Sequence, residues 1–220
     1  MSINARNVVR PQNTRRTPTG CAGCRDRAAV SRGCCGRRRC RVHAAWCAAA
    51  RHGYRDRILS AFVRDGTKTK TDAGPPATDI QATLTVIGRR TAIGTGLPDL
   101  GNAHIPKAIL YGANLSRAYL SGSDLSGSDL SDANLSGAYL SDADLRGANL
   151  RDAFLRGAFL RGADLSRADL RRAHLSDAYL SGAILSGADL SGVTVTQAQL
   201  DQACGINAKL DPGLTIKPCS

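Results

Sequence analysis

The chain has 220 residues, enough for one or two domains, and carries 30 Lys and Arg against 18 Asp and Glu, a formal net charge of +12. It contains no uninterrupted apolar run long enough to cross a membrane, which argues against a membrane-spanning protein. The charge is unevenly divided. Residues 1–97 hold 19 basic and 5 acidic residues (+14), residues 98–200 hold 9 and 11 (−2), and the last twenty are neutral.

Residues 1–43 are rich in Arg, Gly and Cys and show neither helical nor strand periodicity, which predicts a disordered region. The tract Arg37 to Arg41 could attract nucleic acid or an anionic membrane surface by counterion release. No aromatic residues interleave with these arginines for base stacking, so a solvated basic tail is the preferred interpretation. We therefore expect no nucleic-acid partner.

Six of the eight cysteines lie in the first 47 residues. Cys21 and Cys24, followed after fifteen residues by Cys40 and His43, have the spacing of a four-ligand zinc site. The intervening residues offer little apolar packing, so incidental thiols in a disordered segment are the preferred alternative. We expect no metal and no cofactor.

Two short helices are expected before residue 105. Residues 44–64 are helical in composition, with an apolar face and a stop at Gly66, and residues 65–77 read as a linker. A capping helix and lead-in follow over residues 78–104, with Thr78 or Asp79 as N-cap. Residues 44–50 are too Ala-rich and too far along the chain for a signal peptide, so we expect a cytoplasmic protein.

A period of five residues dominates residues 105–200. Leu occupies nearly every fifth position, and Ala lies two residues before it, replaced only at Ser123, Ser128 and Val193. A helix would place residues five apart about 140° apart, and a continuous strand would flip every second Leu to the other face. The pattern fits short strands separated by corners, in which Ala113 and Leu115 point inward and Asn114 points outward.

These tandem pentads resemble the pentapeptide repeat family, whose consensus is A(D/N)LXX. The resemblance implies an all-β solenoid, a right-handed quadrilateral parallel β-helix with four pentads per coil and short flanking α-helices. The segments ILSAFVRD and DIQATLTVIGRR also resemble those that precede the repeats in bacterial members. Residues 1–50 do not match the region further upstream in those members, and either a misassigned start or frameshift or a divergent tail would explain the difference.

A coil of twenty residues sorts the outward side chains by face. One face carries aromatic residues and two are rich in acidic residues or Asn, and the interior, filled with Leu and Ala, has no room for a ligand. The aromatic residues are Tyr119, Tyr139, Phe159 and Tyr179, and the other two sets are Asp124, Asp144 and Asp164, and Asp129, Asn149, Asp169 and Asp189. We expect the acidic side chains to be solvated or to bond nearby backbone, the alternative being a bound cation.

Residues 196–220 are expected to close the open end of the coil with a capping helix over Thr196 to Ala203, followed by a tail. Cys204 and Cys219 would pair only in an exported protein, so in the cytoplasm we expect free thiols.

No catalytic constellation is recognisable, because the four histidines are isolated, and Ser, which recurs as a corner residue, has no His and acid partners implied by the spacing. We expect a non-enzymatic scaffold that binds an unknown protein partner or associates with itself. The aromatic file is either its interaction face or a stack that only stabilises the coil. The alternative function, known for some family members, is protection of DNA gyrase by mimicry of DNA, which the near-neutral repeat disfavours.

A girdle of arginines occupies the same corner position in four consecutive pentads. We expect interleaved acidic residues to neutralise this girdle. The arginines are Arg146, Arg151, Arg156 and Arg161, and the acids are Asp142, Asp144, Asp152 and Asp164.

Overall fold

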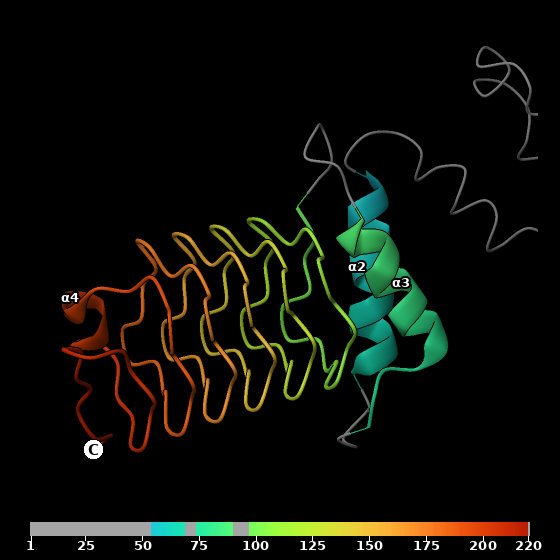
Figure 1. Cartoon of the computed structure of the whole chain (residues 1–220). Coiled ribbons are helices and arrows are strands. Elements are labelled where there is room, and N and C mark those ends of the chain that lie inside the picture. Colours follow the sequence, from blue (N-terminus) through green and yellow to red (C-terminus); the bar gives the residue numbers. More distant parts are fainter. Residues whose placement is uncertain (1–53, 69–73, 90–96, 220) are drawn as a thin grey trace, which may run out of the picture. The chain divides into compact units, whose positions relative to one another are not determined.

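The computed structural model describes residues 54–68, 74–89 and 97–219 (Figure 1). The zinc candidate Cys21, Cys24, Cys40 and His43 and the basic N-terminal region lie outside these residues. No helix in the described ranges is both long and apolar enough to span a bilayer.

The repeats form a column of stacked four-sided coils (Figure 1). The outward residue of each pentad makes a parallel bridge to the residue twenty positions further on, as between Tyr119 and Tyr139. The four pentads per coil and the β-helix are therefore confirmed. The bridges are isolated, so within the described ranges each side of a coil is shorter than a regular strand.

The column is longer than the predicted boundaries of 105 and 200. Its first bridge joins Asp99 to Tyr119, and its last joins Asp189 to Lys209. At the start Pro98 takes the place of the inward Ala, and near the end Gly205 takes the place of the inward Leu. These substitutions hide the first unit and the unit around Cys204 from a search for Ala-x-Leu, and the last unit, Ala208 to Leu210, keeps the pattern but is separated from the others.

The inward Leu and Ala side chains form one continuous core. The Leu side chains from Leu100 to Leu190 are at most 2% exposed. Backbone bonds join successive coils: Tyr139 donates its N–H to Ala118 O of the coil before (2.9 Å), and Leu140 donates to Phe159 O of the coil after (2.8 Å). The spacing of side chains along the column is therefore fixed by the backbone.

From residues 101–102 to residues 191–192, each corner is a turn whose second residue lies in the left-handed region. At one corner Ala138 N donates to Leu135 O (2.9 Å), and the second of the two residues between them, Gly137, has φ +64°. Glycine adopts this conformation at no steric cost. Nonetheless Arg117, with φ +56°, and several Asp, Asn and Lys residues occupy the same position.

Two helices close the N-terminal end of the column. Helix α2 spans Tyr54–Thr67 and α3 spans Thr78–Gly88. Three side-chain oxygens and one carbonyl accept the backbone N–H groups of the four sides of the first coil. They are Ser60 Oγ for Asp99 (3.0 Å), Thr67 Oγ1 for His104 (3.2 Å), Gln81 Oε1 for Ile109 (2.9 Å) and Gly88 O for Asn114 (2.8 Å). The expected covering of a strand edge by helices thus takes the form of four specific hydrogen bonds.

The ends of these helices differ from the sequence-based expectation. Helix α2 continues past residue 64 and past Gly66 to Thr67, whose hydroxyl donates to Val63 O (2.9 Å). The N-cap of α3 is Ala77, not Thr78 or Asp79. Ala77 follows two prolines in an extended conformation (φ −56°, ψ 152°), and the chain becomes helical at the next residue.

The C-terminal end is closed by helix α4, Gln197–Leu200, and by the tail. Thr196 is the N-cap and forms a reciprocal capping box with Gln199. The helix is shorter than the expected Thr196 to Ala203 because the chain rejoins the column at Cys204, whose N–H donates to Ala183 O (3.0 Å).

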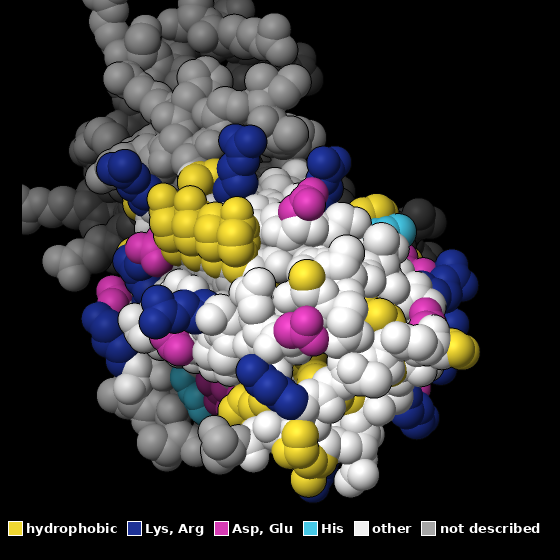
Figure 2. Space-filling model, turned by 90° about the vertical axis from the view of Figure 1, so that its left-hand side faces the viewer, with side chains coloured by type: hydrophobic (Ala, Val, Ile, Leu, Met, Phe, Trp, Pro, Cys, Tyr) yellow, Lys and Arg dark blue, Asp and Glu magenta, His cyan; other side chains and the backbone are white. Residues whose placement is uncertain are grey.

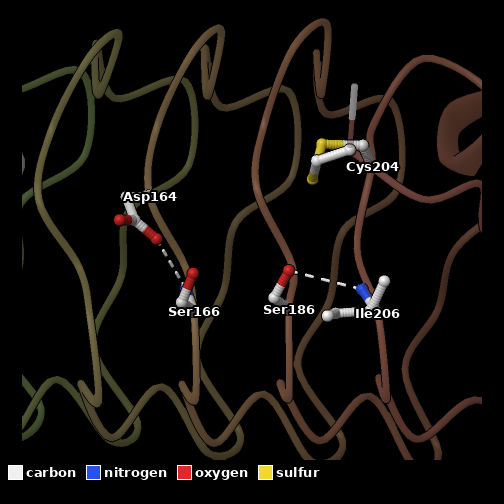
Figure 3. Close-up of a disulfide and its surroundings, with 6 residues drawn as sticks. Asp164, Ser166, Ser186, Cys204 and Ile206 are labelled. Carbon is white, nitrogen blue, oxygen red and sulfur yellow. Dashed lines mark hydrogen bonds between the residues drawn. A yellow bond between two sulfur atoms is a disulfide. The ribbon is translucent and has the colours of Figure 1, made fainter.

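A disulfide fixes the tail to the last coil. Cys204 and Cys219 are bonded, with their Cα atoms 4.8 Å apart (Figure 3), so the expectation of free thiols is wrong. Gly205 N also donates to Lys217 O (2.8 Å) and holds the tail against the column. Disulfides persist in oxidising environments, so this bond does not favour the cytoplasmic location expected from the sequence.

Candidate interaction face

Four aromatic rings form a continuous stack along one face of the column. Neighbouring ring centroids in this aromatic file are 4.9 Å apart, and the planes differ by 10°, 3° and 4°. Its members are Tyr119, Tyr139, Phe159 and Tyr179. The three tyrosines are 45%, 37% and 55% exposed, and Phe159 is half-buried. The spacing of twenty in the sequence therefore becomes a surface of touching rings.

The stack determines which part of each ring is available to a partner. Because the planes are nearly parallel and the centroids 4.9 Å apart, each inner ring covers the face of its neighbours. The file consequently presents ring edges to solvent. It cannot take a base or a sugar between its rings, and it suits contact with another apolar surface.

Polar side chains lie at both ends of the file. Below Tyr119 lies Asp99, which is paired with Arg64 of α2. Beyond Tyr179, the amide of Gln199 donates to Leu175 O (2.8 Å) and Ala178 O (3.0 Å). These contacts belong to the two caps, so the file is limited to four rings.

Charged corner residues line both edges of the file. The edge that precedes the rings in sequence carries Arg117, Arg156 and Asp177, and the edge that follows them carries Asp142 and Arg161. All five are exposed. Arg156 Nε lies 3.5 Å from Asp177 Oδ2. Figure 2 shows a compact block of hydrophobic side chains on the surface, with Lys and Arg side chains beside it.

A second ring stack, missed from the sequence, lies on the next face. Phe154 and His174 stack with centroids 5.1 Å apart and planes 13° apart. Their separation of twenty residues, the length of one coil, is the feature of the sequence that could have predicted this stack. Phe154 is 47% exposed, so it offers a matched comparison for the aromatic file.

The acidic residues on the other two faces serve the corners. Asp124 Oδ1 accepts the backbone N–H of Ser126 (3.0 Å), and the same contact recurs between Asp164 and Ser166 (2.9 Å, Figure 3). A hydrogen bond from Ser191 lowers the pKa of Asp189 below its ordinary value. The expectation that these carboxylates bond nearby backbone is confirmed. Within the described ranges no group of three His, Cys or Asp side chains is placed to hold a metal ion.

The arginine girdle is largely paired with carboxylates, as expected. Arg146 contacts Asp144 at 2.5 Å and Asp164 at 3.8 Å, and Arg151 lies 3.6 Å from Asp152. The partner of Arg156 is Asp177, which the sequence analysis did not name. Since these acids offset the girdle, a large basic surface does not form there.

The two histidines in the described part of the chain do not converge on a reactive serine. His104 Nδ1 lies 2.7 Å from Asp124 Oδ2 at the start of the column, and His174 stacks on Phe154. His43 and His52 lie outside the described residues.

Comparison with known proteins agrees with this geometry. A family model described as "Pentapeptide repeats" matches eight copies, over residues 99–132, 128–167 and 168–204. No curated protein sequence matches the chain.

Several solved structures are similar to the column. A pentapeptide repeat protein (Rfr23) from the cyanobacterium Cyanothece 51142 is 31% identical, over 52% of this chain and 65% of its own length, with a TM-score of 0.39. Another from Nostoc PCC 7120 is 29% identical, over 61% of this chain and 96% of its own, with a TM-score of 0.36. QnrB1, a plasmid-mediated fluoroquinolone resistance protein, is 23% identical, over 56% and 76%, with a TM-score of 0.33. The matched repeats and the twenty-residue coil lead to one conclusion: the chain belongs to the pentapeptide repeat family.

Proposed function

We propose that the chain is a non-enzymatic protein-interaction module, a rigid β-helix scaffold whose contact face is the aromatic file. The observation that carries this proposal is a stack of four rings, three of them exposed tyrosines, on one face of a column whose coils are joined by backbone hydrogen bonds. Aromatic side chains are enriched in the cores of protein interfaces, where they supply area at little entropic cost.

The rigidity of the column supports binding. Tyr139 shows the pattern: its own N–H donates to Ala118 O of the coil before, and the N–H of the next residue, Leu140, donates to Phe159 O of the coil after. A partner therefore meets a preformed surface, and little conformational entropy is lost on association. The buried Leu and Ala core fills the interior, so binding takes place on the outside.

The distribution of charge favours this function over mimicry of DNA. A protein that replaces DNA needs a strongly acidic surface, whereas residues 98–200 have 9 basic and 11 acidic residues. Many of those acids bond corner N–H groups or arginines, as Asp169 does with Arg171 at 2.6 Å. The alternative of gyrase protection consequently has less support than protein binding through the file.

Affinity capture with the full chain tests the proposal. Three baits are compared: wild type, a file variant with Tyr139→Ser and Tyr179→Ser, and a control with Phe154→Ser and Ile109→Ser on other faces. We expect a protein that wild type and control retain and the file variant loses, and that binds the purified chain directly. If the three baits retain the same proteins, the file is not the contact face. If purified wild-type chain rescues quinolone-poisoned gyrase, mimicry replaces the scaffold as the function.

A further inference from the structure

We propose that the occupant of the aromatic file is a second copy of this chain, docked file to file with the two columns antiparallel. The inference rests on the proposed function, because it takes the file as the contact face, and it names the partner. The two-fold axis lies across the face, perpendicular to the column, between Tyr139 and Phe159. Tyr119 then faces Tyr179 of the second copy.

The spacing of the rings favours another column as the partner. The ring edges recur every 4.9 Å along the face and form ridges separated by shallow grooves. An extended peptide that lies along the file advances about 3.3 Å per residue and soon loses register with these ridges. A second column has the same 4.9 Å period, so its rings stay in register along the whole file. We number the four levels of the file from Tyr119 (first) to Tyr179 (fourth).

Charges along one edge of the file complement themselves in the antiparallel arrangement. The residues before the four rings bring Arg117 at the first level and Asp177 at the fourth. Antiparallel docking places this edge against the same edge of the second copy with the levels reversed. Arg117 of each copy consequently faces Asp177 of the other, and the symmetry creates this pair twice.

The opposite edge is complementary by the same operation. Asp142 lies at the second level and Arg161 at the third, so each Asp142 faces Arg161 of the other copy. In total, four pairs of opposite charge flank the rings and no two like charges are opposed. Asp142 and Arg161 are both exposed, and neither side chain takes part in an ion pair between described residues of a single copy.

A parallel arrangement of the two columns does not have this property. It places the two different edges against each other at equal levels, so that Arg156 faces Arg161 and no opposite charges meet. Like charges directly opposed across an interface are unfavourable. The charges of the corner residues therefore select the antiparallel dimer.

The size of the face sets the strength of association. Four levels make a face roughly 20 Å tall and about 10 Å wide, so the contact is smaller than a standard interface of about 1,600 Å². We therefore expect a weak dimer that forms at high protein concentration and weakens as salt screens the flanking pairs.

Sedimentation velocity of the full chain over a concentration series is the first measurement. Wild type should shift from monomer to dimer below about 1 mM, and the file variant Tyr139→Ser with Tyr179→Ser should stay monomeric. A wild type that is monomeric throughout, or a file variant that dimerises equally, would overturn the inference. Capture of a different protein by the file would still support the proposed function, so the two failures are distinguishable.

Mixing two charge variants tests the antiparallel geometry. In a dimer of Asp142→Arg alone, the new arginine of each copy faces Arg161 of the other, and in a dimer of Arg161→Asp alone, the new aspartate of each copy faces Asp142 of the other. Each variant should therefore dimerise about tenfold more weakly than wild type. Mixed one to one, they should recover association, because both cross-copy pairs in the mixed dimer are again opposite in charge. Arg171→Asp, at a corner away from the file, should dimerise as wild type does. Absence of recovery on mixing, or tighter association of Arg161→Asp alone, would refute the arrangement.

Discussion

The Ser60 hydroxyl offers a direct test of how the column is closed. Ser60 is fully buried in α2, and its Oγ accepts the backbone N–H of Asp99, at the first bridge of the column (3.0 Å). The substitution Ser60→Ala removes one oxygen and leaves that N–H without its acceptor. Little packing is lost, so the change isolates the hydrogen bond.

The size of the effect follows from the burial of this contact. A buried donor left unsatisfied costs about 1–3 kcal/mol, and a part-buried one lies in the lower half of that range because water can reach it. The Asp99–Ser60 bond is part-buried. We therefore expect Ser60→Ala to lower the free energy of unfolding by about 1–2 kcal/mol.

Urea denaturation followed by circular dichroism measures this loss. The matched control is Ser121→Ala, at an exposed corner of the column, which should change the unfolding free energy by less than about 0.5 kcal/mol. Hydrogen exchange should also show faster exchange of the Asp99 amide in the Ser60 variant. Equal midpoints and m-values for the two variants would refute the view that α2 closes the first coil through this hydroxyl.

The remaining predictions concern the tail, the acidic faces and one glycine. Cys219→Ser should cost about 3 kcal/mol, since the Cys204–Cys219 disulfide closes a loop with a sequence separation of 15, and wild type with reductant should melt like the variant. Unchanged stability of the variant would show that the tail does not depend on the bond. Asp169 has a lowered pKa because its carboxylate is hydrogen-bonded to Arg171. The stability it contributes is therefore complete above its ordinary pKa, near pH 4, and is lost as the pH falls below that value. Asp169→Asn should show a smaller fall in melting temperature between pH 4 and pH 2 than wild type, and an identical fall would contradict this. Gly205→Ala should lower the melting temperature, because the added Cβ would lie 2.9 Å from the Leu185 carbonyl carbon in the C-terminal coil. The control Gly101→Ala should be tolerated, since the nearest atom to its Cβ would be 3.4 Å away. Equal melting temperatures for the two variants would refute the steric argument.

The repeat could be predicted from the sequence because it is periodic. The period of five residues predicted the inward Leu and Ala side chains. The coil length of twenty residues predicted the aromatic file from Tyr119 to Tyr179. The same spacing would have identified the pair Phe154 and His174, had it been applied to all four faces.

The ends of the column could not be predicted in the same way because they break the period. The bond from Asp99 to Ser60 joins residues 39 apart, and no repeat relates them. Pairing of Cys204 with Cys219 likewise depends on how the tail returns across the last coil, which residue spacing does not specify. The contacts of the caps do not follow the repeat, so they can be identified only from the three-dimensional structure.

Hydroxyl-radical footprinting of the full chain against its own concentration tests the central claim most directly. Tyr139 and Phe154 are 37% and 47% exposed on neighbouring faces, so each serves as the reference for the other. If the aromatic file is the contact face and a second copy occupies it, oxidation of Tyr139 falls as concentration rises while oxidation of Phe154 stays constant. Equal oxidation of Tyr139 at every concentration, or parallel protection of both residues, would contradict the account.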